Sequence, residues 1–384
     1  MLRRNLFTQL CQITYPLIQA PMSPVTSPEL VATVSNAGGL GSIAGARMTG
    51  EQLEKEIARV RSLTTNTFAV NLFISPDEHE FNRFLPLIES TRKELKNLLH
   101  SKRWSNFPID IDAIVVQPPK NLYPEQIEVI FEQRIPLLSF TFGCVSDKII
   151  ERCKQLGILL MGTATTPHEA IYLQQKGCDA ICLQGSEAGG HRGSFLTNDD
   201  ETIEKSTIGL LSLLSQTKQF IDADSYPLVV AGGIMNGHDL ANVLMSGASA
   251  VQMGTRFLTC DESKTLVPKH HQDLLLNAKN GIDRLRKTVL TRAYTGKPAR
   301  GIQTAITDHF SNFNKQIIPV LPWQIQSQLV LPISQEAAKI GHTDFMQLWA
   351  GQNYTYCSSQ PATTIVHQVI REAREIADHQ LIIG

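Results

Sequence analysis

Short apolar runs alternate with amphipathic stretches along most of this 384-residue chain. Apolar runs of about four to eight residues between turn-forming residues predict buried strands, whereas apolar positions recurring every three or four residues predict helices. The predicted strands cover residues 18–22, 41–44, 68–73, 137–140, 159–162, 180–183, 228–231 and 250–253. Helices are predicted between them, with one opening at Ser27 and others over 49–63, 146–156, 167–176 and 237–246.

The predicted strands are apolar along almost their whole length, which is typical of a parallel sheet covered on both faces. Repeated strand–helix units of this kind place the chain in the α/β class. Eight such units favour a closed (β/α)8 TIM barrel over an open doubly wound sheet.

Two regions interrupt the alternation. Residues 75–124 form a polar, proline-bearing excursion that is too long for an ordinary loop and contains helical pieces around 81–99. The alternation stops again at about residue 260. We therefore expect a barrel over 1–260, a smaller and mainly helical lid domain over 261–343, and a segment over 344–384 that returns to the barrel with an amphipathic helix at about 361–379.

Nearly every predicted strand ends in a small or polar residue. These ends are Met22, Ser42, Asn71, Phe142-Gly143, Thr163, Gln184, Gly232-Gly233 and Gly254-Thr255. In a TIM barrel the carboxyl ends of all strands meet on one face, where such enzymes place their active sites. The sequence therefore predicts a ligand site built from these residues.

The segment 184–193 follows one of these strands and surrounds His191 with glycines. A histidine in such a loop can act as a general base, or as a cation that holds an anionic substrate. Glu187 is a second candidate acid or base, although capping of the loop's own backbone amides is the favoured role. Arg192 points to neither role.

The glycines at 232–233 and 254–255 end two successive strands, and the first pair leads into a helix. Backbone N–H groups and a helix N-terminus suit a phosphate group. The chain has neither a P-loop motif nor a Gly-x-Gly-x-x-Gly after the first strand. A mononucleotide phosphate therefore fits better than a nucleoside triphosphate or a Rossmann-bound dinucleotide.

Composition excludes several classes of partner. The net charge of −1 gives no reason to bind nucleic acid or an anionic membrane. No apolar window approaches the roughly 18 residues of a membrane span. The start of the chain lacks a signal-peptide pattern, so we expect a cytoplasmic protein.

No metal site is predicted. The seven cysteines are scattered, and Cys178 and Cys182 make a poor zinc candidate, so reduced thiols are expected. No histidine pair has metal-ligand spacing on a helix, and the neighbours His270 and His271 are expected to be exposed.

These residues resemble the nitronate monooxygenases, formerly called 2-nitropropane dioxygenases, which are FMN-dependent barrels. The matching segments run in family order over almost the whole chain. They are residues 19–22, 36–41, 71–73, 140–143, 184–193, 231–234, 254–257, 291–301 and 349–352. The Glu-Ala-Gly-Gly-His-x-Gly portion is the most specific, whereas Ala-Gly-Gly-Ile is shared by many FMN barrels.

The resemblance implies an oxidation of alkyl nitronates, such as propionate 3-nitronate, by O2 to a carbonyl compound and nitrite. It implies His191 as the catalytic residue over the flavin. It also implies FMN contacts from three sets of residues: Met22, Asn71, Thr163 and Gln184 at the flavin ring and ribityl chain; Gly189, Gly232, Gly233, Gly254 and Thr255 at the phosphate; and Gly351 and Gln352 closing the site.

Two other functions stay open at this stage. One is an FMN- and NAD(P)H-dependent enoyl-acyl-carrier-protein reductase, and the other is a flavin-binding module without turnover. The physiological substrate is open too, as is the oligomeric state, for which a homodimer is one candidate.

Overall fold

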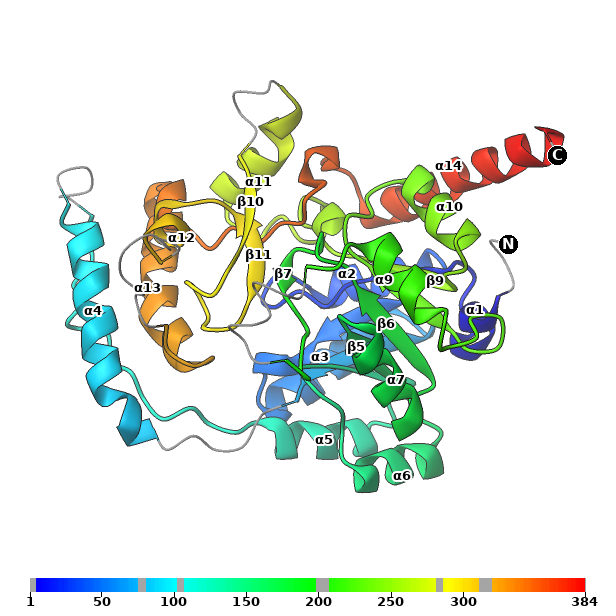
Figure 1. Ribbon diagram of the computed structural model, residues 1–384, viewed down its shortest axis with the longest axis horizontal. Helices are drawn as coiled ribbons and strands as arrows, with labels where there is room; N and C mark the ends of the chain where they lie inside the picture. Colours follow the sequence, from blue (N-terminus) through cyan, green and yellow to red (C-terminus); the bar gives the residue numbers. More distant parts are fainter. Residues whose placement is uncertain are drawn as a thin grey trace.

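The protein folds into a barrel of parallel strands with a second unit packed at one side (Figure 1). The computed structural model describes residues 5–74, 81–101, 107–197, 207–280, 286–310 and 320–383. Parts of the predicted excursion, 75–80 and 102–106, lie outside the described residues.

All eight predicted strands are confirmed and form one parallel sheet in the order β1-β9-β8-β6-β5-β4-β3-β2. A backbone bridge joins Ile18 of β1 to Leu40 next to β2, so the sheet closes on itself. The fold is therefore the expected TIM barrel. The strands are β1 (Leu17–Gln19), β2 (Gly41–Ala44), β3 (Phe68–Phe73), β4 (Leu137–Thr141), β5 (Leu159–Ala164), β6 (Ala180–Gln184), β8 (Leu228–Ala231) and β9 (Ala250–Met253).

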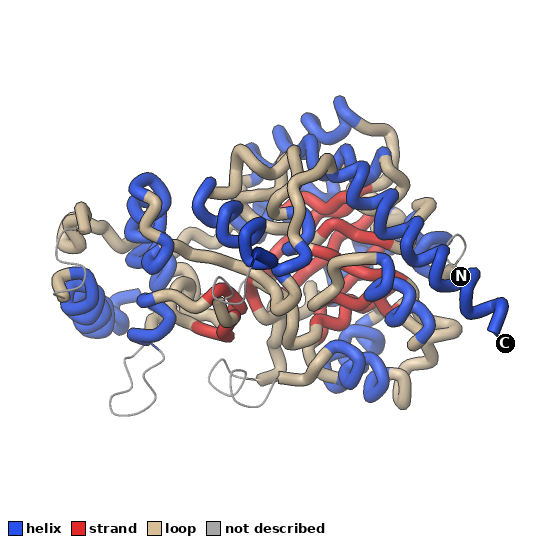
Figure 2. The backbone as a smooth tube through the Cα atoms, turned by 90° about the horizontal axis from the view of Figure 1, so that it is seen from above, coloured by secondary structure: helices blue, strands red, loops and turns tan. Residues whose placement is uncertain are grey.

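Helices surround these strands on the outside, as Figure 2 shows. Local signals in the sequence explain where they begin. Ser27 Oγ accepts a hydrogen bond of 3.0 Å from the Leu30 N–H, and Pro28 occupies the first helical position. The outer helices are α2 (Pro28–Asn36), α3 (Gly50–Leu63), α5 (Tyr123–Glu132), α6 (Asp147–Leu156), α7 (Pro167–Lys176), α9 (Leu210–Thr217), α10 (Gly237–Met245) and α14 (Ala362–Ile383).

The amino-terminal end of the barrel is closed by α1 (Leu6–Cys11), which the sequence analysis did not predict. Phe7 and Cys11 of this helix are buried in one apolar cluster with the strand residues Ile18, Leu137 and Val229. The helix is fixed to this end because the Asn5 side chain donates a hydrogen bond of 2.6 Å to the Ser249 carbonyl, just before β9.

The second unit joins two stretches that are far apart in the sequence. Buried apolar residues of α4 (Leu85–Leu99) belong to the same cluster as those of α13 (Ile325–Ile340). Figure 1 shows α4 beside α13. The excursion thus contributes to the core of the second unit. The other helices of this unit are α11 (Lys269–Asn277) and α12 (Ala305–Phe310).

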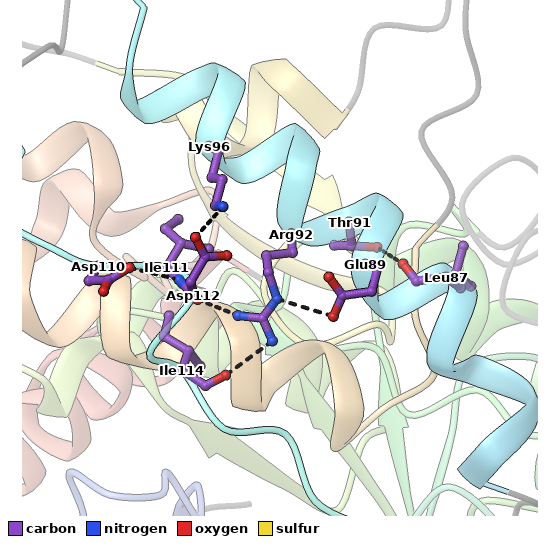
Figure 3. A network of polar contacts seen from close by, with 9 residues as sticks. All are labelled: Leu87, Glu89, Thr91, Arg92, Lys96, Asp110, Ile111, Asp112 and Ile114. Atoms are coloured by element: carbon purple, nitrogen blue, oxygen red, sulfur yellow. Dashed lines mark hydrogen bonds and ion pairs between the residues drawn. The ribbon is translucent and has the colours of Figure 1, made fainter.

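Polar contacts hold α4 to the segment that follows it (Figure 3). Arg92 donates to the carbonyl groups of Ile111 and Ile114, and Lys96 pairs with Asp112. The Gln117 N–H then donates to the Gln328 side chain of α13 at 2.8 Å.

The expectation of a mainly helical second domain missed a hairpin. Strands β10 (Thr288–Thr291) and β11 (Ala299–Ile302) pair antiparallel, and β11 also pairs with β7 (Gly190–His191). Because β7 lies in the loop after β6, this small sheet connects the second unit directly to the barrel.

Candidate active site

The glycine-rich loop after β6 is held in one conformation by its own strand end. Gln184 donates from Nε2 to the His191 carbonyl at 2.9 Å and accepts from the Gly193 N–H at Oε1 at 2.8 Å. His191 also pairs with Ala299 of β11. The position of His191 is therefore set by both the barrel and the second unit.

Glu187 of this loop caps a helix. Its carboxylate accepts hydrogen bonds of 2.9 and 3.1 Å from the Leu210 N–H, at the start of α9. The expectation that Glu187 caps backbone amides of its own loop is therefore wrong, because the amide that it caps belongs to α9.

Arg192 stabilises the loop through hydrogen bonds to backbone carbonyl groups. It is buried, and its guanidinium donates to the Gln184 and Thr165 carbonyls. Burial lowers the pKa of Arg192 to about 10, so its charge persists at neutral pH.

The His191 imidazole is half-buried and neutral. Its Nε2 lies 3.0 Å from Thr295 Oγ1. Burial, and after it the positive charges of Arg47 and Lys297, lower the pKa of His191 from 6.5 to about 3. At neutral pH the ring therefore offers a lone pair and is no cation.

Polar side chains line the carboxyl end of the barrel below His191. Asn71 Nδ2 donates to Ser139 Oγ on the next strand at 2.9 Å. The hydroxyls of Thr163 and Thr141 lie 3.4 Å apart. Asn71 and Thr163 are predicted strand ends, and each lies beside a polar side chain of β4, namely Ser139 or Thr141.

The C-terminal loop packs on the glycine-rich loop with almost no space between the two backbones. A Cβ atom at Gly189 would lie 2.5 Å from the Gly351 nitrogen, so any larger residue there would push the loops apart. Gly351 donates its N–H to Thr255 Oγ1 at 3.0 Å, and the Gln352 N–H donates to the Glu187 carbonyl at 3.0 Å.

The glycines after β8 and β9 fit the expected phosphate role. Among the described residues, no hydrogen-bond acceptor is present for the N–H groups of Gly233 and Gly254. Gly254 also adjoins Met22, since a Cβ atom there would lie 3.5 Å from its sulfur. Gly232 lies close to Ala188, since a Cβ atom at Gly232 would lie 3.1 Å from the Ala188 nitrogen. The predicted cofactor residues therefore lie on one face of the barrel.

The two neighbouring histidines of α11 differ in their exposure to solvent. His270 is exposed, as expected, but His271 is buried, contrary to expectation. Its ring contacts the Trp349 carbonyl, and burial lowers the pKa of His271 to about 4. In the described parts of the chain the cysteines are unpaired, and no cluster of three or more His, Cys, Asp or Glu side chains is arranged for a metal ion.

Several side chains around His191 were not predicted as site residues. Thr295 and Lys297 lie within a segment that matches the family, so a signal for them was present in the sequence. Arg47, in the 3-10 turn after β2, and Trp323, before α13, carried no such signal.

Comparison with known proteins now identifies the family. The family model described as "Nitronate monooxygenase" matches residues 4–372. The chain belongs to the nitronate monooxygenase family. A relative from Staphylococcus aureus (strain MSSA476), named "Probable nitronate monooxygenase", is 36% identical over 380 residues, which are 99% of this chain and 100% of the relative.

Solved structures agree. A nitroalkane oxidase from Streptomyces ansochromogenes superposes with a TM-score of 0.83 at 33% identity, covering 97% of this chain and 99% of the other. FabK from Thermotoga maritima shares the fold, with a TM-score of 0.71 at 24% identity and 99% coverage of both chains.

The protein is accordingly an oxidoreductase that acts on a small molecule, and its family implies a flavin cofactor. None of the helices in the described ranges combines the length and apolar character that crossing a bilayer demands.

Proposed function

We propose that this nitronate monooxygenase binds FMN and oxidises alkyl nitronates, such as propionate 3-nitronate, with O2. Two nitronates and one O2 would together give two carbonyl compounds and two nitrite ions, which accounts for both oxygen atoms. One observation supports this function above all others. His191, whose pKa is lowered by burial, follows β6 at the carboxyl end of the barrel, where among the described residues the N–H groups of Gly233 and Gly254 have no hydrogen-bond acceptor.

The FMN phosphate would take hydrogen bonds from the loops that carry Gly232, Gly233, Gly254 and Thr255, with Gly189 keeping the loops in contact. The isoalloxazine ring and ribityl chain would lie along the polar side chains at the carboxyl end of the barrel. Their expected contacts are Met22, Asn71, Thr163 and Gln184, with Gly351 and Gln352 covering the site. The bound flavin would supply the electron transfer, which no protein side chain provides.

Thr295 decides which nitrogen of His191 is available. Its hydroxyl lies 3.3 Å from the Lys297 carbonyl and donates to it, so it accepts from the His191 Nε2–H. We therefore assign the Nε2–H tautomer, which leaves the Nδ1 lone pair free. Nδ1 would take the proton from the carbon of a neutral nitroalkane, whereas a preformed nitronate needs only to be positioned.

The unit over 261–343, together with the segment 344–384, would cover the flavin and keep water out. The pairing of His191 with Ala299 supports this role, because the same small sheet that orients the histidine belongs to the cover.

The test is air-free mixing of the purified, flavin-loaded enzyme with propionate 3-nitronate and, separately, with NADPH. We expect heat denaturation to release FMN, and we expect the nitronate to reduce the flavin while NADPH leaves it oxidised. Admitting O2 should then release nitrite and consume oxygen. Rapid reduction by NADPH would favour the enoyl reductase, and no reduction by either compound would favour a binding module.

A further inference from the structure

A cluster of aromatic rings lies around His191. The ring centroids of Phe73 and Phe142 each lie 5.8 Å from that of His191, and the Trp349 ring lies 5.9 Å away. Trp323 extends the wall, at 5.5 Å from Phe73 and 6.0 Å from Phe142. These four residues come from β3, the end of β4, the segment before α13 and the C-terminal loop.

Phe142 adopts a backbone conformation that phenylalanine rarely takes. Its φ is +74°, in the left-handed region that favours glycine. The other non-glycine residues with positive φ in the described chain are polar or charged: Gln12, Arg134 and Gln324. Backbone strain of this kind persists where the surrounding structure requires it, often at functional sites.

In this backbone conformation the Phe142 side chain is largely buried between other aromatic rings. Phe142 follows the last residue of β4 and is 9% exposed, and its ring contacts Phe73 at 4.7 Å as well as His191. A glycine would remove the strain but leave no ring above the histidine. The presence of phenylalanine at a position that favours glycine therefore points to a function of the ring.

A positive charge lies against the Phe142 ring of this cluster. Lys297 Nζ lies 5.0 Å from the Phe142 ring centroid, on the segment that also carries Thr295. Gly296 between them lets the chain before α13 pack closely, since a Cβ atom there would lie 2.8 Å from the Trp323 nitrogen. The indole Nε1 of Trp323 is buried and has no partner among the described residues, so it can donate to a ligand.

We propose that Phe142 is a specificity-determining residue, whose ring with Phe73 and Trp323 selects nitronates that carry a flat or branched apolar substituent. The proposal rests on the proposed nitronate oxidation. The negative nitronate group would lie toward Lys297, and the apolar substituent would lie against the three rings. Such a pocket gains contact area with phenylnitromethane nitronate but little with nitroethane nitronate.

The deciding experiment compares wild type with Phe142→Gly on these two nitronates, by initial rates of nitrite release. We expect the ratio of kcat/KM, phenylnitromethane over nitroethane, to fall about tenfold or more. We expect Tm to fall, because the loss of a largely buried ring outweighs the relief of the left-handed strain. A ratio unchanged within about twofold, including an equal loss on both substrates, would overturn the proposal.

Gln12→Gly is the matched control, since it relieves a φ of +55° at the end of α1, far from the site. It should keep the wild-type ratio. Should Phe142→Gly not fold, Trp323→Leu tests the same pocket without touching a strained backbone, and it should lower the same ratio.

A binding assay separates this inference from the proposed function. Titrating flavin-free protein with neutral phenylnitromethane or nitroethane should quench tryptophan fluorescence, because Trp323 and Trp349 lie in the pocket wall. Absence of nitrite from every nitronate with the wild-type enzyme would defeat the proposed function alone. Phe142→Gly should still weaken the binding of phenylnitromethane more than that of nitroethane, and equal weakening would defeat the pocket.

Discussion

The two ends of the barrel are built from the same strands but differ in chemistry. At the amino-terminal end, α1 inserts Phe7 and Cys11 into an apolar layer, and these side chains are fully or almost fully buried. At the carboxyl end, Asn71, Thr163 and Gln184 present polar groups, and glycines replace side chains at 232–233 and 254.

This difference separates stability from function. Side chains at the closed end contribute mainly through apolar burial, so their loss should reduce stability and leave turnover intact. Side chains at the open end leave polar atoms accessible to a ligand. Their loss should reduce turnover and leave the fold intact.

The largest effect is expected from His191→Asn at the open end. Turnover of a neutral nitroalkane should fall by about 10²–10⁴, because the free Nδ1 lone pair is lost. Turnover of the preformed nitronate should fall less, and flavin content should stay unchanged because the phosphate loops lie on other strands. Steady-state nitrite assays and the flavin absorbance of the purified variant check this.

His270→Asn is the matched control, since His270 is exposed on α11 and should be replaceable without loss. Equal losses on nitroalkane and nitronate would remove the base role of His191. Wild-type rates on both would remove His191 from the mechanism.

Phe7→Ala at the closed end should lower the free energy of unfolding by about 3–5 kcal/mol, measured by urea titration, because it leaves a cavity. The kcat/KM of the folded fraction should stay unchanged. Leu211→Ala, at a position that is 56% exposed on α9, should cost less than about 0.5 kcal/mol. A loss of kcat/KM in Phe7→Ala without loss of stability would contradict the conclusion that the closed end contributes to stability and the open end to turnover.

A smaller effect concerns acid stability. The pKa of His271 is about 4 in the folded protein and about 6.5 when unfolded, so between these values the unfolded chain binds a proton that the native chain does not. The free energy of unfolding should therefore decrease as the pH is lowered. At pH 5 the loss that this group causes is about 2 kcal/mol. His271→Asn should reduce that fall, as measured by urea titrations at pH 7 and pH 5, whereas an unchanged fall would exclude His271 as its source.

The barrel was predictable because each strand is a short apolar run between turn residues, a signal that is local in the sequence. The polar residues near the carboxyl ends of the strands followed from the same pattern, since Gln184 ends one such run and Asn71 lies near the end of another. A capping role for Glu187 was predictable, but its partner Leu210 at the start of a helix was not, because the two residues meet only in the fold.

What escaped prediction depends on contacts between distant segments. The strands β10 and β11 are short, and pairing with β7 stabilises them more than their own composition does. His271 is buried because its helix packs beneath Trp349. The aromatic cluster brings together Phe142 and Trp323, which are 181 positions apart in the sequence, and no local pattern predicts such a contact.

The central claim is that the open end presents a neutral histidine to the substrate. Nitrogen-15 NMR of histidine-labelled enzyme tests it directly, with the His191 signals assigned by their absence from His191→Asn. We predict that the His191 ring stays in the neutral Nε2–H form from pH 8 down to about pH 4, because the pKa of His191 is about 3. A protonation midpoint near the ordinary value of about 6.5 would contradict it.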